Sequence, residues 1–168
     1  MCDHHRMPRR HFLGLIPGMV LAVSGCSQQT TGPVEIKWGR DTCDYCGMVI
    51  DEPRFAAQLR GGANRKVYKF DDLGDAVLFL VKQDWANDPA TEFWVGGLEI
   101  AKGQWLDGLK AFYLSGQRSP MAHGFGAVAD QREGTVDFTR MKGMVVARGS
   151  TSRCEPTSNA EGGTENRG

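Results

Sequence analysis

The sequence predicts an α+β protein in which two related β-β-α-β units pack into one small body. First, residues 68–77 align with residues 136–145, with apolar residues matching at the first, third, sixth, ninth and tenth places. Second, each segment begins with the alternation typical of a strand and continues with apolar residues at helical spacing. Third, Asp71 and Thr139 stand at the two junctions, where a side-chain oxygen can cap the first turn of a helix.

Shorter apolar segments complete the two units. Four of them are predicted to be strands: residues 55–57, 92–95, 110–114 and 125–127. This assignment divides the folded part into a first unit at residues 34–90 and a second unit at residues 91–148, which are long enough to share one core. Core or groove positions are expected for three tryptophans that stand in strand-like surroundings: Trp38, Trp94 and Trp105.

The first 25 residues have the features of a signal peptide. Arg9 and Arg10 lie in a basic start, and the apolar run at residues 12–22 is too short for a membrane span. The run ends in Leu-Ala-Val-Ser-Gly-Cys, which resembles a lipobox. Removal of residues 1–25 would therefore leave Cys26 as the lipidated first residue. The arginine pair also resembles a twin-arginine signal, so Sec and twin-arginine export both stay open.

Polar, small residues flank the folded part. Residues 26–33 are predicted to be the lipidated cysteine and a flexible tether, and residues 149–168 a disordered tail. These features predict a lipid-anchored protein of the cell envelope that faces the periplasm. Ser27 stands where an Asp favours retention in the inner membrane, and its identity favours the outer membrane.

Charge and cysteine content exclude two classes of protein. Loss of residues 1–25 leaves 17 of the 20 basic and 19 of the 20 acidic residues, so the mature chain lacks the basic excess that nucleic-acid binding needs. Four cysteines remain: Cys26, Cys43, Cys46 and Cys154. Because one is assigned to lipid and one lies in the predicted tail, a disulfide framework is not expected.

Soft ligands gather in two short motifs. Cys43, Cys46 and Met48 lie within six residues, with a glycine that allows the backbone to turn. Met121 and His123 occupy the corresponding place in the second unit, and His123 is the only histidine after residue 25. Thiolate and thioether ligands select Cu(I), and thiolates also bind zinc. If the two loops meet, these five side chains predict one accessible Cu(I) site and a carrier rather than an enzyme.

Other interpretations of the same residues stay open. The Cys-x-x-Cys pair is also found in thiol oxidoreductases, although Gly47, Val49 and Ile50 favour a strand or turn over the helix that activates such a pair. The methionines are also compatible with ordinary core packing, as in a structural adaptor of a membrane complex. Asp71 and Asp72 are predicted to be helix-cap and first-turn residues rather than catalytic carboxylates.

These motifs together resemble the NosL family, envelope lipoproteins that act as copper chaperones in the maturation of nitrous oxide reductase. The resemblance covers the lipobox at Cys26, the motif at residues 43–48, the Phe-Asp-Asp stretch at residues 70–72 and Ser-Pro-Met at residues 119–121, which Gly-Phe-Gly-Ala follows. It extends over most of the folded part.

The resemblance implies Cu(I) as the bound metal, with Cys46 and Met121 as ligands. It also implies delivery to an ABC-type membrane complex that loads nitrous oxide reductase. It leaves open whether Cys43 and Met48 are ligands, neighbours of ligands or structural residues. It equally leaves open whether the recipient is nitrous oxide reductase or another copper enzyme.

The lipobox makes a first prediction. Radioactive palmitate is expected to label the wild-type chain during expression in bacteria and to leave Cys26→Ala unlabelled, because the thiol of Cys26 is the site of acylation. Gel autoradiography measures both. Label that survives the substitution would show that Cys26 is not the lipidated residue.

Overall fold

The computed structural model describes residues 30–149 and contains two antiparallel sheets and two helices, which confirms the α+β class. The first sheet has the order β2-β1-β3-β4 and the second has the order β6-β5-β7. The elements are β1 (Ala57–Gly61), β2 (Lys66–Phe70), α1 (Leu73–Leu80), β3 (Glu92–Val95), β4 (Leu106–Asp107), β5 (Phe112–Ser115), β6 (Phe125–Val128), β7 (Thr135–Val136) and α2 (Phe138–Arg148). The predicted signal peptide, Cys26 and nearly all of the predicted tail lie outside the described residues.

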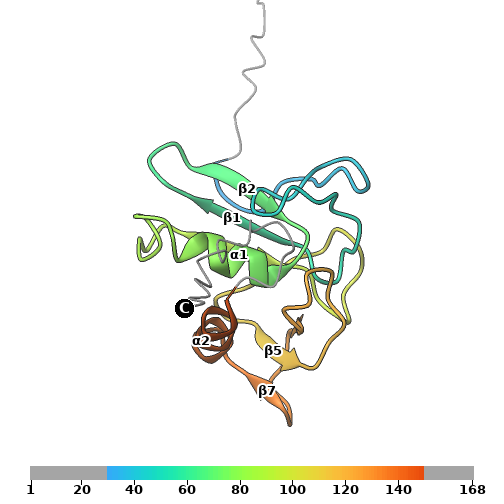
Figure 1. Cartoon of the computed structure of the whole chain (residues 1–168). Helices are drawn as coiled ribbons and strands as arrows, with labels where there is room; N and C mark the ends of the chain where they lie inside the picture. Colours follow the sequence, from blue (N-terminus) through green and yellow to red (C-terminus); the bar gives the residue numbers. More distant parts are fainter. Residues whose placement is uncertain (1–29, 150–168) are drawn as a thin grey trace, which may run out of the picture.

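The elements stack in layers, with α1 between the β1–β2 ribbon and the part of the molecule that holds α2, β5 and β7 (Figure 1). Seven of the eight residues of α1 are buried, because the helix has apolar residues around most of its circumference. One core joins both sheets and both helices, with large side chains that include Leu59, Phe70, Phe93, Tyr113 and Met141. The two predicted units therefore form one body.

The segment at residues 32–36 covers the outer face of the first sheet, and we call it the N-terminal strap. The backbone of Val34 exchanges two hydrogen bonds of 2.9 Å with the side-chain amide of Gln58 in β1. Arg60, two residues further along β1, donates to the carbonyl oxygen of Gly32. As a result β1 is buried on both faces. The last two residues of the predicted tether, Gly32 and Pro33, belong to this bound strap.

Both helices begin at an aspartate, but not at the residues that the sequence predicted. Asp72 caps α1 by accepting a hydrogen bond from the backbone N–H of Gly74 at 2.9 Å. Asp137 caps α2 by accepting from Arg140 at 2.8 Å. The predictions of Asp71 and Thr139 as caps were wrong, because each helix starts one or two residues away from the position assumed in the alignment.

The two halves share the element types of a repeat but differ in strand pairing. From β1 to β3 the chain has the order β-β-α-β, and β1 pairs with both β2 and β3, although β3 falls within the predicted second unit, residues 91–148. In the second half β5 is the central strand, pairing with β6 and β7. A parallel bridge between Gly97 and Ala127 connects the first sheet to the second, with a hydrogen bond of 2.9 Å from Leu98 N–H to the Ala127 carbonyl.

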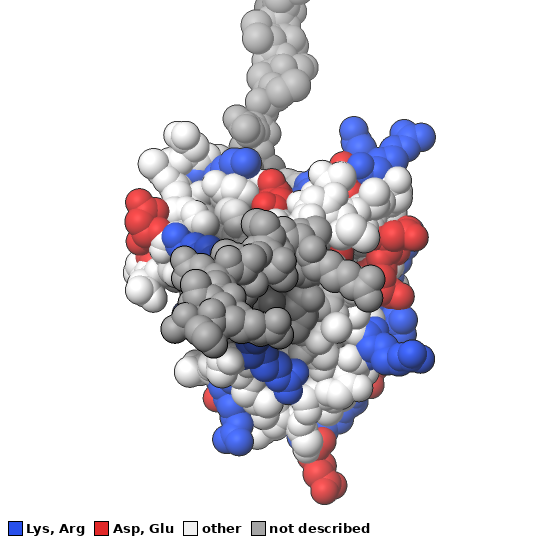
Figure 2. Space-filling model, viewed as in Figure 1, with Lys and Arg blue, Asp and Glu red and all other residues white. Residues whose placement is uncertain are grey.

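The surface carries both signs of charge. Figure 2 shows Lys and Arg side chains interspersed with Asp and Glu around the face viewed, in agreement with the formal net charge of zero. Among the described residues, no helix has the length and apolar character needed to cross a bilayer.

Close backbone packing after β3 makes a prediction about stability. A Cβ atom at Gly96 would lie 1.9 Å from the carbonyl oxygen of Pro53, and backbone cannot move aside as a flexible side chain can. Gly96→Ala is expected to lower the free energy of unfolding by about 2 kcal/mol or more. Gly143→Ala is the matched control, because a Cβ there meets nothing within 4 Å and should raise the stability of α2 by about 0.5–1 kcal/mol.

Urea denaturation measures both effects. Equal stabilities of the two variants would contradict the packing described between Gly96 and Pro53.

Candidate metal centre

A closed loop carries the two thiols. The Cys43 N–H donates to the Met48 carbonyl at 2.8 Å, and the Gly47 N–H donates back to the Cys43 carbonyl at 3.0 Å. Gly47 has a φ of +76°, in the left-handed region that favours glycine. The base of the loop closes where the Ile50 N–H donates to the Asp41 carbonyl at 2.9 Å. Cys43 and Cys46 are therefore held on one tight turn.

The loop is fixed to the edge of β2 through one strand residue, Lys69. Asp44 donates its N–H to the Lys69 carbonyl at 2.8 Å and accepts the Lys69 N–H on its carboxylate at 2.7 Å. The Lys69 ammonium binds the Asp41 carboxylate at 2.5 Å, and this pairing lowers the pKa of Asp41. These contacts place the thiols at the end of β2, next to the start of α1.

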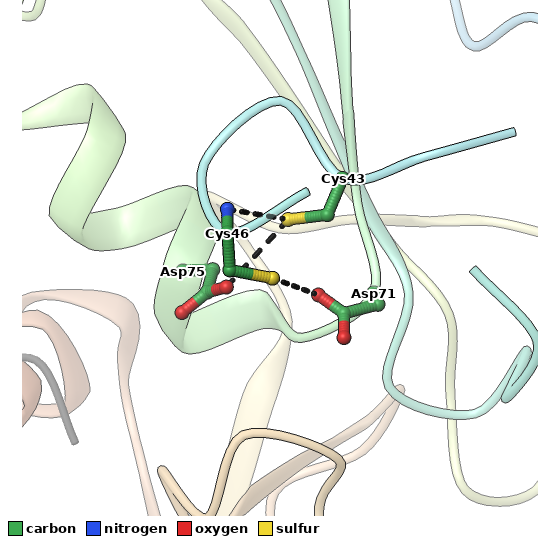
Figure 3. Close-up of side chains that lie close together, drawn as sticks. All are labelled: Cys43, Cys46, Asp71 and Asp75. Carbon is green, nitrogen blue, oxygen red and sulfur yellow. Dashed lines mark hydrogen bonds between the residues drawn. The ribbon is translucent and has the colours of Figure 1, made fainter. Parts of the chain in front are cut away.

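Two carboxylates complete the cluster at the start of α1 (Figure 3). One ligand atom from each of Cys43, Cys46, Asp71 and Asp75 lies within 4.8 Å of the others. The Cys43 thiol donates to Asp75 at 3.6 Å, and the Cys46 thiol donates to Asp71 at 3.5 Å. Cys46 alone of the four is partly exposed, so the cluster opens to solvent on its side. Two sulfurs and two oxygens could hold a metal ion here.

The second sulfur-bearing loop, residues 119–124, reaches the same helix end. The Met121 N–H donates to the Asp72 carboxylate at 3.0 Å, and His123 Nε2 lies 2.8 Å from Asp75 Oδ1. The imidazole packs so closely on α1 that a Cβ at Gly74 would lie 2.1 Å from it. Ala122 has a φ of +60°, a conformation that costs a non-glycine residue energy and that turns the chain just before His123.

Burial keeps both thiols protonated in the metal-free protein. Desolvation raises the pKa of Cys43 to about 12, against backbone N–H groups that lower it. Desolvation also raises the pKa of Cys46 well above its usual range, and the neighbouring Cys43 and Asp75 raise it further. A thiol in this state donates to a carboxylate and is a poor nucleophile.

Asp71 and Asp72 are likewise shifted towards their neutral forms. Desolvation raises the pKa of Asp71, where the charge of Asp75 adds to the effect, and desolvation also raises the pKa of Asp72. For His123, desolvation lowers the pKa, but the hydrogen bond to Asp75 and the surrounding carboxylates outweigh it, so the net direction is upward. His123 and Asp75 thus form a buried, hydrogen-bonded pair.

The five metal ligands that the sequence predicts differ in their burial and in their distance from the cluster. Cys43 and Cys46 lie in the cluster, and His123 contacts it through Asp75. Met121 is half-buried with its backbone on Asp72, whereas the Met48 residue is 53% exposed at the rim of the cysteine loop.

The two acidic members of the cluster are not among the metal ligands that the sequence predicts. The sequence pattern indicates a helix cap at Asp71 and gives Asp75 no role. Their spacing of four residues across the start of a helix was the available signal, because it brings side chains to one face.

Comparison with solved structures gives a likeness of fold. The chain is similar to the crystal structure of the copper chaperone NosL from Shewanella denitrificans, with 16% sequence identity and a TM-score of 0.49, over 68% of this chain and 87% of that chain. No protein-family model and no curated protein matches the chain.

The raised thiol pKa values predict a steep pH dependence of metal binding. Each thiol that becomes a thiolate ligand must release a proton, so the apparent affinity should rise about tenfold per pH unit for one thiolate and about a hundredfold for two. If Cys43 is a ligand, the apparent affinity should keep rising with pH until the pH approaches the Cys43 pKa of about 12. Competition titrations at a series of pH values measure the slope, and Cys43→Ser should reduce a two-thiolate slope to that of one. Affinity independent of pH would exclude thiolate ligation.

Proposed function

We propose that this protein is a Cu(I) metallochaperone of the cell envelope. The observation that carries the proposal is the convergence of the Cys43 and Cys46 thiols, whose ligand atoms share a 4.8 Å cluster at the start of α1. Sulfur ligands select Cu(I) over hard cations. Because Cys46 is partly exposed, a metal bound to it is accessible to an incoming ligand. A site of this kind suits exchange rather than permanent storage.

Met121 is the proposed thioether ligand. The hydrogen bond from its backbone to Asp72 holds its loop against the start of α1, beside which the thiols of the cysteine loop lie. Cys46 and Met121 together would bind Cu(I) with a low coordination number, which leaves room for a ligand from a partner. Cys43, Met48 and His123 are the remaining candidates for a third ligand. Of these, Cys43 lies in the cluster and Met48 at its exposed rim.

The proposed recipient is an ABC-type membrane complex that loads nitrous oxide reductase. The support for this step is the sequence resemblance at the cysteine motif, at residues 70–72 and at residues 119–121. A lipid anchor at Cys26 would hold the carrier at the membrane where such a complex resides. The protein would then act as a carrier and not as an enzyme.

The carboxylates favour zinc as a second candidate cargo. Two thiolates and two carboxylates form a complete tetrahedral donor set for Zn²⁺, whereas Cu(I) has no need of the oxygens. The alternative of a thiol oxidoreductase is disfavoured, because such enzymes lower a cysteine pKa and burial here raises both. A structural adaptor, the other alternative, would bind its partner equally well without metal.

Titration with Cu(I) against a competing chelator tests the proposal. The wild-type protein is expected to bind one Cu(I) per chain, Cys46→Ser to lose this binding, and Met121→Ala to weaken it by about tenfold or more. Met144→Ala is the matched control, because this half-buried methionine lies on α2, outside both loops. Unchanged affinity in Cys46→Ser would defeat the proposal.

The variant Asp75→Asn distinguishes zinc from Cu(I) as the cargo, with Co²⁺ used as a spectroscopic substitute for Zn²⁺. Binding of Co²⁺, with its tetrahedral absorption bands, should be lost in this variant if the four-ligand set is the true site. Zinc would be favoured as the cargo if Co²⁺ or Zn²⁺ binds tightly, if this binding needs Asp75, and if Cu(I) does not displace the bound ion.

A further inference from the structure

A pair of stacked tryptophans lies outside the metal centre. The rings of Trp38 and Trp105 are 6.5 Å apart at an interplanar angle of 12°, and the Lys102 ammonium lies 5.1 Å from the Trp38 ring. They line a groove of about 260 Å³, which we call the tryptophan groove, formed by Pro33, Val34, Glu35, Ile36, Trp38, Gly103 and Trp105. Both tryptophans are only partly buried. The proposed metal function gives this groove no role.

Gly32, at the start of the N-terminal strap, is held in place beside the groove by largely buried side chains, a set of contacts that we call the clamp. Gly32 donates its N–H to the Glu92 carboxylate at 2.6 Å and accepts two hydrogen bonds from Arg60, at 3.1 and 2.8 Å. Arg60 is 4% exposed and Glu92 is partly buried, so this clamp is largely shielded from solvent. The next residue, Pro33, lines the groove. The clamp therefore fixes the point from which the preceding residues leave the body.

The distance to the predicted lipid is short. Gly32 follows Cys26 by six residues, and six residues span at most roughly 20 Å even when fully extended. A diacylglycerol on Cys26 would thus keep the clamp, and the groove beside it, within that distance of the bilayer surface. This step rests on the lipid anchoring that forms part of the proposed function.

We propose that the tryptophan groove docks onto the anionic phospholipid surface of the membrane that holds the anchor. Indole rings with one apolar and one polar side prefer the headgroup region of a bilayer. The ammonium of exposed Lys102 stands 5.1 Å from the ring of Trp38, where it can pair with an anionic headgroup beside the groove. Glu35 is the one acidic residue among those that line the groove.

Docking at a second point would fix the orientation of the body. A single tether allows the domain to turn freely, whereas the lipid and the groove together define one face towards the membrane. Trp38 precedes Cys43 by five residues, and the Gly39 N–H bonds to the Ile50 carbonyl at the base of the cysteine loop. The cysteine loop would therefore be presented at a constant height above the bilayer.

Quenching of tryptophan fluorescence by brominated lipids tests this proposal on the mature, lipidated protein. The chain has four tryptophans, so two matched double variants divide them: Trp38→Phe with Trp105→Phe, and Trp85→Phe with Trp94→Phe. In vesicles of phosphatidylethanolamine and brominated phosphatidylglycerol, the first variant should lose most of the quenching seen in the wild type. The second should keep most of it.

Lys102→Glu is a further variant, at an exposed position where folding should be unaffected. It should reduce the quenching through charge repulsion, even if the aromatic variants fold poorly. Equal quenching in the two double variants, no quenching of the lipidated wild type, or absence of lipid on Cys26 would each overturn the proposal.

A Cu(I) titration of the same vesicles separates this proposal from the metal function. Normal Cu(I) binding without quenching would overturn the docking alone. Cross-linking of the protein is a further check. If dimers form through the face that carries Trp38 and Trp105, and brominated lipid does not quench these residues, a second copy of the chain occupies the groove and the docking proposal is overturned.

Discussion

The candidate centre depends on the way in which one carboxylate, that of Asp75, is shared between the two halves of the chain. One of its oxygens accepts the Cys43 thiol from the first loop, and the other contacts His123 from the second. The residue itself is fully buried on α1. Each partner therefore determines where the other lies, and displacement of either loop would leave a buried polar group without its hydrogen bond, which is costly.

The position of the cluster at the start of α1 explains how so many acidic groups are tolerated. Three aspartates and two thiols gather there, at the end of the helix where free N–H groups and the helix dipole favour negative charge. Burial opposes that charge and raises the pKa values of the thiols. The metal-free cluster thus stores its protons on sulfur, and a bound cation would supply the positive charge that the two thiols and two carboxylates themselves lack.

Local sequence signals predicted the class of the fold and the thiol pair, because strand alternation, helical spacing and a Cys-x-x-Cys motif are all short-range patterns. The strand at residues 92–95 and the turn at Gly47 were predicted in this way. The pairing of β5 between β6 and β7 was not, because it is set by contacts between distant segments.

The acidic half of the cluster was missed for the same kind of reason. Asp71 and Asp75 look like ordinary helix-start residues until the cysteine loop is placed against them. The hydrogen bonds of Asp44 and Lys69 achieve that placement, and they join residues 25 positions apart. The lipid anchor at Cys26 and the identity of the recipient stay predictions.

The contact between His123 and Asp75 spans 48 residues of chain, and this separation has a consequence for the order of folding. Contacts of long sequence separation form late, since the loop between them must first be closed. A nascent chain would therefore offer only an isolated pair of cysteines, with no shaped surroundings to discriminate between ions. Selectivity would arise only in the finished molecule, which makes the timing of metal encounter relative to folding a determinant of which ion is bound.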